Sequence, residues 1–168
     1  PCGYFGDPTH ECKCMPGQIL RYQKRVSGPV IDRIDIHLDV PAVKLDKLTE
    51  DDKGRLAESS LQIQKRVQKA RDMQTKRFSA RGGSSSGRKS EIASNSEMVS
   101  KDVKELLELS SECRELLRLA VSRMNLSARS YYRTIKLART IADLEDAKNI
   151  APNHVAEALQ YRPRVDNI

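Results

Sequence analysis

The sequence predicts a mainly α-helical protein with about four helices, one β-strand and a cysteine-rich loop at the N-terminus. Three observations support this fold class. The 168 residues include five Tyr, two Phe and no Trp, a composition that favours an aliphatic helical core. Apolar residues recur at steps of three and four over much of the second half of the chain, which is the period of a helix. Residues 34–40 instead alternate apolar and polar side chains, as a strand with one buried face does.

The N-terminal part of the chain divides into two predicted segments. Residues 1–15 are rich in Gly and Cys and are expected to be irregular. Residues 16–41 are expected to hold a short helix beginning at Pro16, because proline suits the first helical turn, and then the strand. A single strand does not make a sheet, and the chain offers this one hardly any neighbour.

Residues 42–100 are predicted to connect this part to the helices that follow. They contain a polar connector and a basic helix over residues 59–78. A loop rich in Gly and Ser comes next, with the sequence Arg-Gly-Gly-Ser-Ser-Ser-Gly-Arg. Since this loop has no apolar side chain to bury, we expect it to be mobile.

Residues 101–168 are predicted to form a helical bundle. Its first apolar stripe can be interrupted at Ser110-Ser111. Ser127 is the expected N-cap of the next helix, which should extend to about Glu145. A last helix is expected over residues 152–161. No apolar run in the sequence approaches the roughly 20 residues that a bilayer-spanning helix needs, and no signal peptide is visible.

Positive charge is concentrated in one part of the chain. The formal net charge is +7, and residues 61–90 hold nine Lys or Arg against one acid, Asp72. Such a window favours contact with a polyanion such as DNA, although a solvated helix face is an equal alternative. The candidate nucleic-acid contacts on the predicted helix are Lys65, Arg66, Lys69, Arg71, Lys76 and Arg77.

Three of the four cysteines lie near the N-terminus in a C-x₉-C-x-C pattern, as Cys2, Cys12 and Cys14. Crowded cysteines favour a Zn²⁺ site over a disulfide framework and fit a cytosolic protein. His10 could complete a Cys₃His set, and three reduced thiols in a mobile N-terminus are the alternative. Cys113 lies on a helix stripe and is expected to be buried. The single histidines His37 and His154 are expected at the surface.

Two arginines occupy unusual positions. Arg33 directly precedes the predicted strand, where an arginine most often pairs with a nearby acid such as Asp32 or Asp35. Arg129 falls in the first turn of a predicted helix, where the positive end of the helix dipole disfavours a cation. A phosphate partner would offset that cost, and a tolerated surface arginine is the alternative. Arg133 and Lys136 should project from the same face.

Several motifs resemble one family when they are taken together and in order. The stretches "GPVIDRIDIHLDVP", "LSARSYYRTIKLARTIADLE" and "HVAEALQYR" are similar to the C-terminal part of the magnesium-chelatase-like AAA+ ATPases, specifically the ComM/YifB competence-protein group. The opening "CGYFGDPTHECKCMPGQILRYQKRVSGP" is similar to the same group. The resemblance covers residues 1–41, 61–78 and 101–165.

The resemblance implies a role for each part. Residues 16–41 would end an AAA+ core, and the bundle would be its helical lid. Arg33 would be the arginine finger that reaches the nucleotide of a neighbouring subunit, and Arg129 the sensor-2 residue that contacts ATP. Arg133 and Arg139 would pack or contact an interface. The complete bacterial, cytoplasmic protein would bind ATP and Mg²⁺, form a ring homo-oligomer, expected to be a hexamer, and remodel branched DNA as a branch-migration-type helicase.

The sequence contains no G-x-x-x-x-G-K-[ST] motif and no apolar strand ending in paired acids. The chain does not begin with Met, so we expect a fragment that works with an upstream AAA+ core and is inactive alone. Related sequences carry a further Cys-Pro just upstream, which implies a fourth thiolate. Two alternatives stay open. The first is an ATPase subunit of a magnesium chelatase, and the second is a non-enzymatic, zinc-stabilised nucleic-acid-binding module.

Overall fold

The computed structural model describes residues 1–7, 9–38, 40, 58–79 and 92–162. Within these ranges the chain is mainly helical, with seven α-helices and no sheet, which confirms the predicted fold class. The described part of the chain divides into two compact units, one within residues 1–40 and one spanning residues 58–162. The predicted connector at 42–55 and most of the Gly/Ser-rich loop lie outside the described residues. No helix of the described part is both long and apolar enough to cross a membrane.

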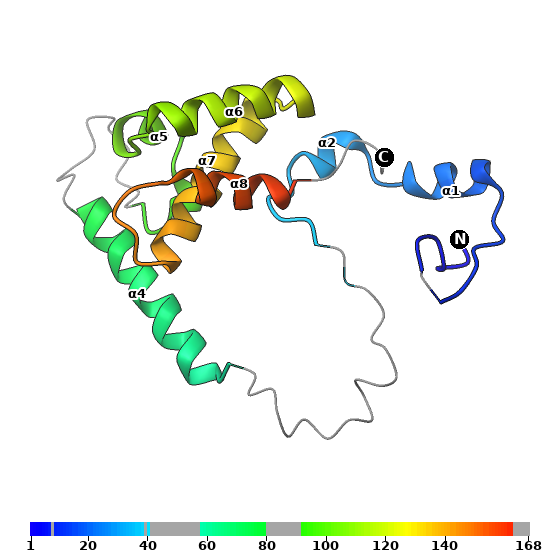
Figure 1. The fold of residues 1–168 in the computed structure, drawn as a ribbon, viewed down its shortest axis with the longest axis horizontal. Coiled ribbons are helices and arrows are strands. Elements are labelled where there is room, and N and C mark those ends of the chain that lie inside the picture. Colours follow the sequence, from blue (N-terminus) through cyan, green and yellow to red (C-terminus); the bar gives the residue numbers. More distant parts are fainter. Residues whose placement is uncertain (8, 39, 41–57, 80–91, 163–168) are drawn as a thin grey trace. The chain divides into compact units, whose positions relative to one another are not determined.

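The first unit contains two short helices, α1 (Pro16–Gln23) and α2 (Gly28–Ile31) (Figure 1). The helix α1 begins where the sequence predicts, and the Gln18 side chain accepts a hydrogen bond from the Met15 N–H at 3.1 Å. The single turn α2 was not predicted. Its Gly-Pro start places proline in the first turn, where the missing N–H costs no hydrogen bond.

The alternating segment forms no strand in the described part of the chain. Residues 34–38 and 40 have no strand assignment, so the predicted strand is wrong for these residues. Its four apolar side chains are all exposed, from 43% at Ile34 to 89% at Val40. The alternating pattern indicates one apolar face that could be buried. A strand also needs a neighbouring backbone to pair with, and no described segment provides one.

The second unit is a bundle that sequence periodicity predicted closely (Figure 1). Its elements are α4 (Ser60–Ser79), the 3₁₀ turn η1 (Asn95–Glu97), α5 (Ser100–Leu106), α6 (Ser111–Met124), α7 (Ala128–Leu144) and α8 (Pro152–Gln160). The core lies around α7 and includes Cys113, Leu117, Ile135, Ala138 and Val155. Cys113 is fully buried, as predicted.

Capping serines set two of the helix starts. The predicted break occurs at Ser110, whose hydroxyl accepts a hydrogen bond from the Cys113 N–H at 3.2 Å. Ser127 caps α7 in the same way, because its hydroxyl accepts from the Ser130 N–H at 3.1 Å. Between them, Asn125 adopts a left-handed conformation with φ 49° and ends α6, a position that asparagine tolerates well.

A buried carboxylate joins the elements of this bundle. The side chain of Asp143 is 0% exposed. It accepts two hydrogen bonds from the Arg77 guanidinium of α4, one from Arg139 Nε at 2.9 Å and one from Asn95 Nδ2 at 2.8 Å. One acid of α7 therefore holds α4, the turn η1 and a second position on α7 itself.

Arg139 extends this cluster into the connection between α7 and α8. Its terminal nitrogens donate to the carbonyl oxygens of Ala147 at 2.6 Å and Lys148 at 3.0 Å. Burial lowers the pKa of the Arg139 guanidinium, and the nearby Asp143 carboxylate opposes that effect. The side chain serves packing, in keeping with the expectation for this residue.

His154 is buried, at 2% exposure, so the prediction of a surface histidine is wrong. Its Nδ1 accepts a hydrogen bond from the Ala151 N–H at 2.9 Å. This fixes the proton of the neutral ring on Nε2, which lies 2.9 Å from Glu145 Oε2. The residue therefore caps the start of α8 and ties it to the end of α7.

We predict that Asp143→Asn strongly destabilises the bundle, because it leaves two guanidinium groups without their counter-ion. Loss of one partner of a buried ion pair costs about 3–5 kcal/mol of the free energy of unfolding. Chemical denaturation followed by circular dichroism measures this loss. The matched control is Asp146→Asn, since Asp146 is 59% exposed, pairs with Lys69 at the surface and has a φ of 60° that asparagine accepts. An exposed pair contributes about 0–1 kcal/mol, so equal losses for the two variants would contradict the assignment.

Candidate functional site

The three N-terminal cysteines come together in the first unit. The sulfur atoms of Cys2, Cys12 and Cys14 all lie within 4.8 Å of one another. Cys2 Sγ and Cys12 Sγ are 3.5 Å apart. Within the described residues this is the one group of three or more Cys, His, Asp or Glu side chains with metal-binding spacing.

Backbone geometry and one acid shape the loop between these cysteines. Gly3 and Gly6 have φ values of 89° and 83°, which residues with a side chain rarely adopt. Asp7 Oδ1 accepts hydrogen bonds from the Thr9 N–H at 2.7 Å, the Thr9 hydroxyl at 2.6 Å and the His10 N–H at 3.1 Å. These hydrogen bonds lower the pKa of Asp7, and the two from Thr9 have the largest effect. The loop therefore turns back far enough for the chain to return Cys12 to Cys2.

The cluster has uneven thiol acidity. The Tyr4 N–H donates to Cys2 Sγ at 3.4 Å and, with hydrogen bonds from Cys14 and Cys12, lowers the pKa of Cys2 to about 7. For Cys12, the Cys14 backbone N–H acts to lower the pKa, but burial and the neighbouring thiols outweigh it, so the pKa is raised. A group with a pKa of about 7 is partly thiolate at neutral pH, and the thiolate is the form that binds metals.

Three sulfur ligands at this spacing suit Zn²⁺, which takes four ligands in a tetrahedron. His10 is not part of the cluster of ligand atoms. Its Nδ1 bonds to the Thr9 hydroxyl at 2.9 Å, and its ring stacks on Tyr4. The structure therefore does not support the Cys₃His set, and a fourth ligand would have to come from elsewhere.

The two singled-out arginines are exposed. Arg33 Nη1 donates to the Pro29 carbonyl oxygen at 2.7 Å, so the side chain folds over the turn α2. Arg129 lies in the first turn of α7, two residues after the capping Ser127. In the described part of the chain, no hydrogen bond or ion pair of its guanidinium is observed.

Lys136 was expected on the same face as Arg129, but its ammonium group is engaged. It donates to the carbonyl oxygens of Ser96 at 2.8 Å and Met98 at 3.1 Å. The lysine therefore fixes the turn η1 and does not add to a phosphate-facing group.

The basic residues of α4 divide by their contacts. Arg77 belongs to the buried Asp143 cluster and has a structural role that its spacing in the sequence did not reveal. Arg66 forms a two-bond ion pair with Glu58, and Lys69 pairs with Asp146 at 2.8 Å. Lys65, Arg71 and Lys76 are exposed.

Lys65, Lys69 and Lys76 form one stripe on α4, which we call the lysine stripe. At about 100° per residue, their steps of four and seven keep them within roughly 40° of one another. The buried residues Ala70 and Gln74 lie on the opposite side of the helix. Positive charge therefore faces solvent along the outer side of α4.

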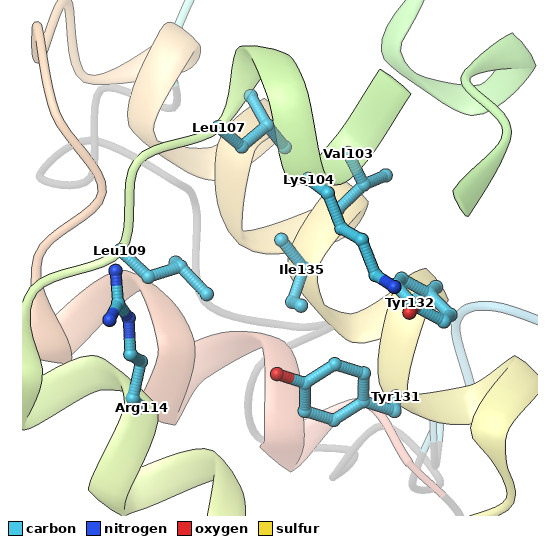
Figure 2. Close-up of a pocket in the computed structure, with 8 residues that line it drawn as sticks. All are labelled: Val103, Lys104, Leu107, Leu109, Arg114, Tyr131, Tyr132 and Ile135. Atoms are coloured by element: carbon cyan, nitrogen blue, oxygen red, sulfur yellow. The ribbon is translucent and has the colours of Figure 1, made fainter. Parts of the chain in front are cut away.

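A pocket of about 220 Å³ opens between α5, α6 and α7 and was not predicted (Figure 2). Its lining comprises Val103, Lys104, Leu107, Leu109, Arg114, Tyr131, Tyr132 and Ile135. Two cations and no acid line it, so its charge favours an anionic group. Tyr131 and Tyr132, which are adjacent in the sequence, both line the pocket, but no spacing in the sequence indicates it.

Comparison with known proteins places these features in a family. Residues 57–162 match the family described as "Magnesium chelatase, subunit ChlI C-terminal", and residues 1–48 match "Magnesium chelatase, subunit ChlI". The chain belongs to the magnesium chelatase ChlI family. It is mainly α-helical where that family's C-terminal region matches, and the resemblance predicted from the sequence motifs is confirmed.

Individual relatives in this family are moderately similar. The chain is 34% identical to "Competence protein ComM" of Haemophilus influenzae over 165 residues, which is 98% of this chain and 29% of that protein. It is 33% identical to "Uncharacterized protein YifB" of Escherichia coli over 162 residues, 96% of this chain and 29% of that protein. The chain thus spans less than a third of the length of these relatives.

We predict that alkylation of Cys2 in the metal-free chain has a midpoint near pH 7, below that of an ordinary thiol, because its pKa is lowered. Alkylation of Cys12, whose pKa is raised, should rise only at a higher pH. Mass spectrometry with fragmentation, after brief treatment with iodoacetamide over a pH series, measures both. Zn²⁺ should slow the reaction of Cys2 in the wild-type chain and much less in Cys12→Ser. Identical pH profiles for the two thiols, or no effect of Zn²⁺, would contradict this reading.

Proposed function

We propose that this chain supplies the arginine finger and the sensor-2 lid of an AAA+ ATPase whose hydrolysis of ATP remodels DNA. Membership of the magnesium chelatase family supports the ATPase part. The observation that carries the proposal is the position of Arg129, exposed in the first turn of α7 at the start of the bundle's central helix. A cation at the positive end of a helix is favourable only when an anion neutralises it.

In this proposal Arg129 donates hydrogen bonds to a phosphate of ATP. Its guanidinium offers five N–H donors in a planar fork, which matches phosphate oxygens. The Ser127 cap fixes where α7 begins, and so fixes the backbone that carries Arg129. The packing of Ile135 and Ala138 on the opposite side of α7 holds the helix in the bundle.

Arg33 serves as the finger that reaches the nucleotide of the neighbouring subunit in a ring homo-oligomer, a hexamer by family resemblance. It would stabilise negative charge that develops on the transferring phosphoryl group. Arg33 Nη1 donates an exposed hydrogen bond to the Pro29 carbonyl oxygen, which a phosphate can replace. The upstream AAA+ core of the full-length protein would hold ATP and Mg²⁺, since the present sequence has no phosphate-binding loop motif.

The lysine stripe supports DNA as the partner. Lys65 and Lys76 present ammonium groups along one exposed side of α4, and Lys69 between them can exchange its exposed ion pair with Asp146 for a phosphate. Phosphates bind to such a row without regard to base sequence. Arg71 is exposed on another side of the same helix and can add to the positive electrostatic potential around it. Arg77 is excluded from this set, because Asp143 already holds it.

The thiol cluster is proposed to bind one Zn²⁺ through Cys2, Cys12 and Cys14. When bound, the ion would cross-link the two ends of the loop and so stabilise it. A structural role is favoured because the cluster carries only sulfur ligands and no general base within the group.

The chelatase ATPase subunit is the second candidate, and the description of the matched family favours it. The relative of 34% identity is instead named a competence protein, which favours DNA. The two proposals differ in the requirement for other subunits and for a porphyrin. Stimulation of ATP turnover by branched DNA would favour the first proposal, and stimulation by a porphyrin together with Mg²⁺ the second.

We expect Arg33→Ala and Arg129→Ala in the full-length protein to reduce ATP turnover strongly. Loss of an arginine finger lowers the rate constant by about 10³-fold or more, because the developing charge loses its stabilising cation. Phosphate release measures turnover, and binding of a fluorescent ATP analogue should be nearly unchanged in Arg33→Ala. The matched control is Arg118→Ala, an exposed arginine of α6 that pairs with Glu115. Full turnover by Arg33→Ala would remove the finger assignment.

We expect the combined variant Lys65→Ala, Lys69→Ala and Lys76→Ala to bind duplex DNA more weakly and with less dependence on salt. Each lost phosphate contact should reduce the slope of log affinity against log salt by about 0.9. Fluorescence anisotropy over a salt series measures both quantities. The control is Lys101→Ala, an exposed lysine of α5. If the slope stays the same, the lysine stripe is not a DNA contact.

A further inference from the structure

We propose that the tip of the cysteine-rich loop is a stacking platform for unpaired nucleic-acid bases. Tyr4 and Phe5 form this tip, and their side chains are 44% and 63% exposed. We call these two residues the aromatic tip. The inference deepens the proposed DNA contact and rests on it, but it concerns a different unit and a different part of the ligand.

The loop presents the aromatic tip in a fixed way. Gly3 and Gly6 flank the two aromatics with φ values of 89° and 83°, so the chain reverses on both sides of them. Space around both glycines is open, and their conformation alone calls for glycine. The Asp7 N–H closes the turn by donating to the Tyr4 carbonyl oxygen at 3.1 Å. The two rings are therefore carried on a closed turn.

The thiol cluster anchors this turn at its base. The Tyr4 N–H donates to Cys2 Sγ at 3.4 Å, and Cys2 lies 3.5 Å from Cys12 by their sulfur atoms. The backbone of the tip is thus bonded directly to the cluster. An exposed aromatic held in this way loses little freedom when a base stacks on it, which raises affinity.

The tip already contains one aromatic stack. The rings of Tyr4 and His10 lie 4.8 Å apart with an angle of 20° between their planes. The imidazole therefore covers one face of the phenol, and Tyr4 as a whole remains 44% exposed. Bases stack on aromatic side chains regardless of their sequence, because every base has a π face.

The same unit carries basic residues. Residues 1–26 hold four cations and two acids, Asp7 and Glu11. The cations are all exposed, and they are Lys13, Arg21, Lys24 and Arg25. Arg25 lies over the ring of Tyr22, 5.6 Å from its centroid, and Tyr22 is 57% exposed. Aromatic rings interleaved with cations are what a single strand binds, since phosphates and bases alternate along it.

This composition favours a nucleic acid over a protein partner. The aromatic tip itself offers two rings that can stack on bases, and the aliphatic side chains that the unit exposes, such as Leu20 and Val26, lie outside the tip. Bases in a duplex are already stacked on one another and cannot reach such rings. The platform should therefore add a preference for single strands to the unspecific phosphate contacts of the lysine stripe.

The test uses the 168-residue chain with two labelled ligands, an oligothymidine and a duplex of the same length, in fluorescence anisotropy at fixed salt. The variant is Tyr4→Leu with Phe5→Leu, which keeps apolar bulk and removes the π faces. We expect its affinity for oligothymidine to fall about 10-fold, and its affinity for duplex to change less than about twofold. Met15→Leu is the control, since Met15 is 73% exposed in the same unit but not aromatic.

A third ligand separates stacking from folding. An abasic strand of the same length carries the phosphates without the bases, so wild type and variant should bind it equally. Titration of the accessible thiols checks that the cysteine cluster is intact in the variant. Equal losses on all three ligands, or unchanged affinity for oligothymidine, would overturn the platform. Unchanged DNA binding with altered self-association in sedimentation velocity would also overturn it and would assign the tip to contact between copies of the chain.

The outcome is distinguishable from failure of the proposed function. If the lysine stripe is not a DNA contact, its triple variant leaves duplex affinity intact. If the platform is wrong, the aromatic variant keeps the wild-type ratio of affinities for oligothymidine and duplex. The two variants lie in separate units of the chain, so their effects can be measured independently.

Discussion

The bundle depends on one carboxylate that is fully buried. Asp143 receives the Arg77 and Arg139 guanidiniums and the Asn95 amide, and those three groups come from α4, α7 and the turn η1. A buried charge is costly unless hydrogen bonds and counter-charges surround it, so each of these partners is needed for the others to stay buried. Apolar packing around Leu117 and Val155 supplies the rest of the core. The polar cluster determines which segments meet, and the apolar residues make that meeting favourable.

The helices of the bundle were predictable because local signals agreed with the apolar period. Ser110 and Ser127 cap where the sequence indicates, and the break between α5 and α6 occurs at the expected serines. The strand was not predictable in this way. Alternation of apolar and polar residues indicates a face that could be buried, but it does not show whether a neighbouring strand is present to pair with. His154 and Arg77 were misread for a related reason. Their partners Glu145 and Asp143 are distant in sequence or follow a turn, and no periodicity reveals such pairs.

The candidate sites show the same division. The spacing of Cys2, Cys12 and Cys14 in the sequence predicts a common site, and in the structure their sulfur atoms are adjacent. It could not exclude His10, because only the stack on Tyr4 shows where that ring lies. The pocket beside Tyr131 could not be predicted from the sequence either, since its walls come from three helices and no linear motif describes them. Residue type indicates which chemistry is available, and tertiary packing decides which groups are already occupied.

The fixed end of α4 has a mechanical consequence. Ala70, Gln74 and Arg77 attach the second half of the helix to the bundle, while Ile63 and Val67 in the first half remain exposed on that same face. With a rise of 1.5 Å per residue, Lys65 stands about 18 Å along the helix from Arg77. Apart from the exposed Lys69–Asp146 ion pair, the first half of α4 therefore extends beyond its attachment to the bundle. If DNA binds at Lys65 as proposed, a force on the strand reaches the Asp143 cluster, and Arg139 connects that cluster to the carbonyl oxygens of Ala147 and Lys148 ahead of α8.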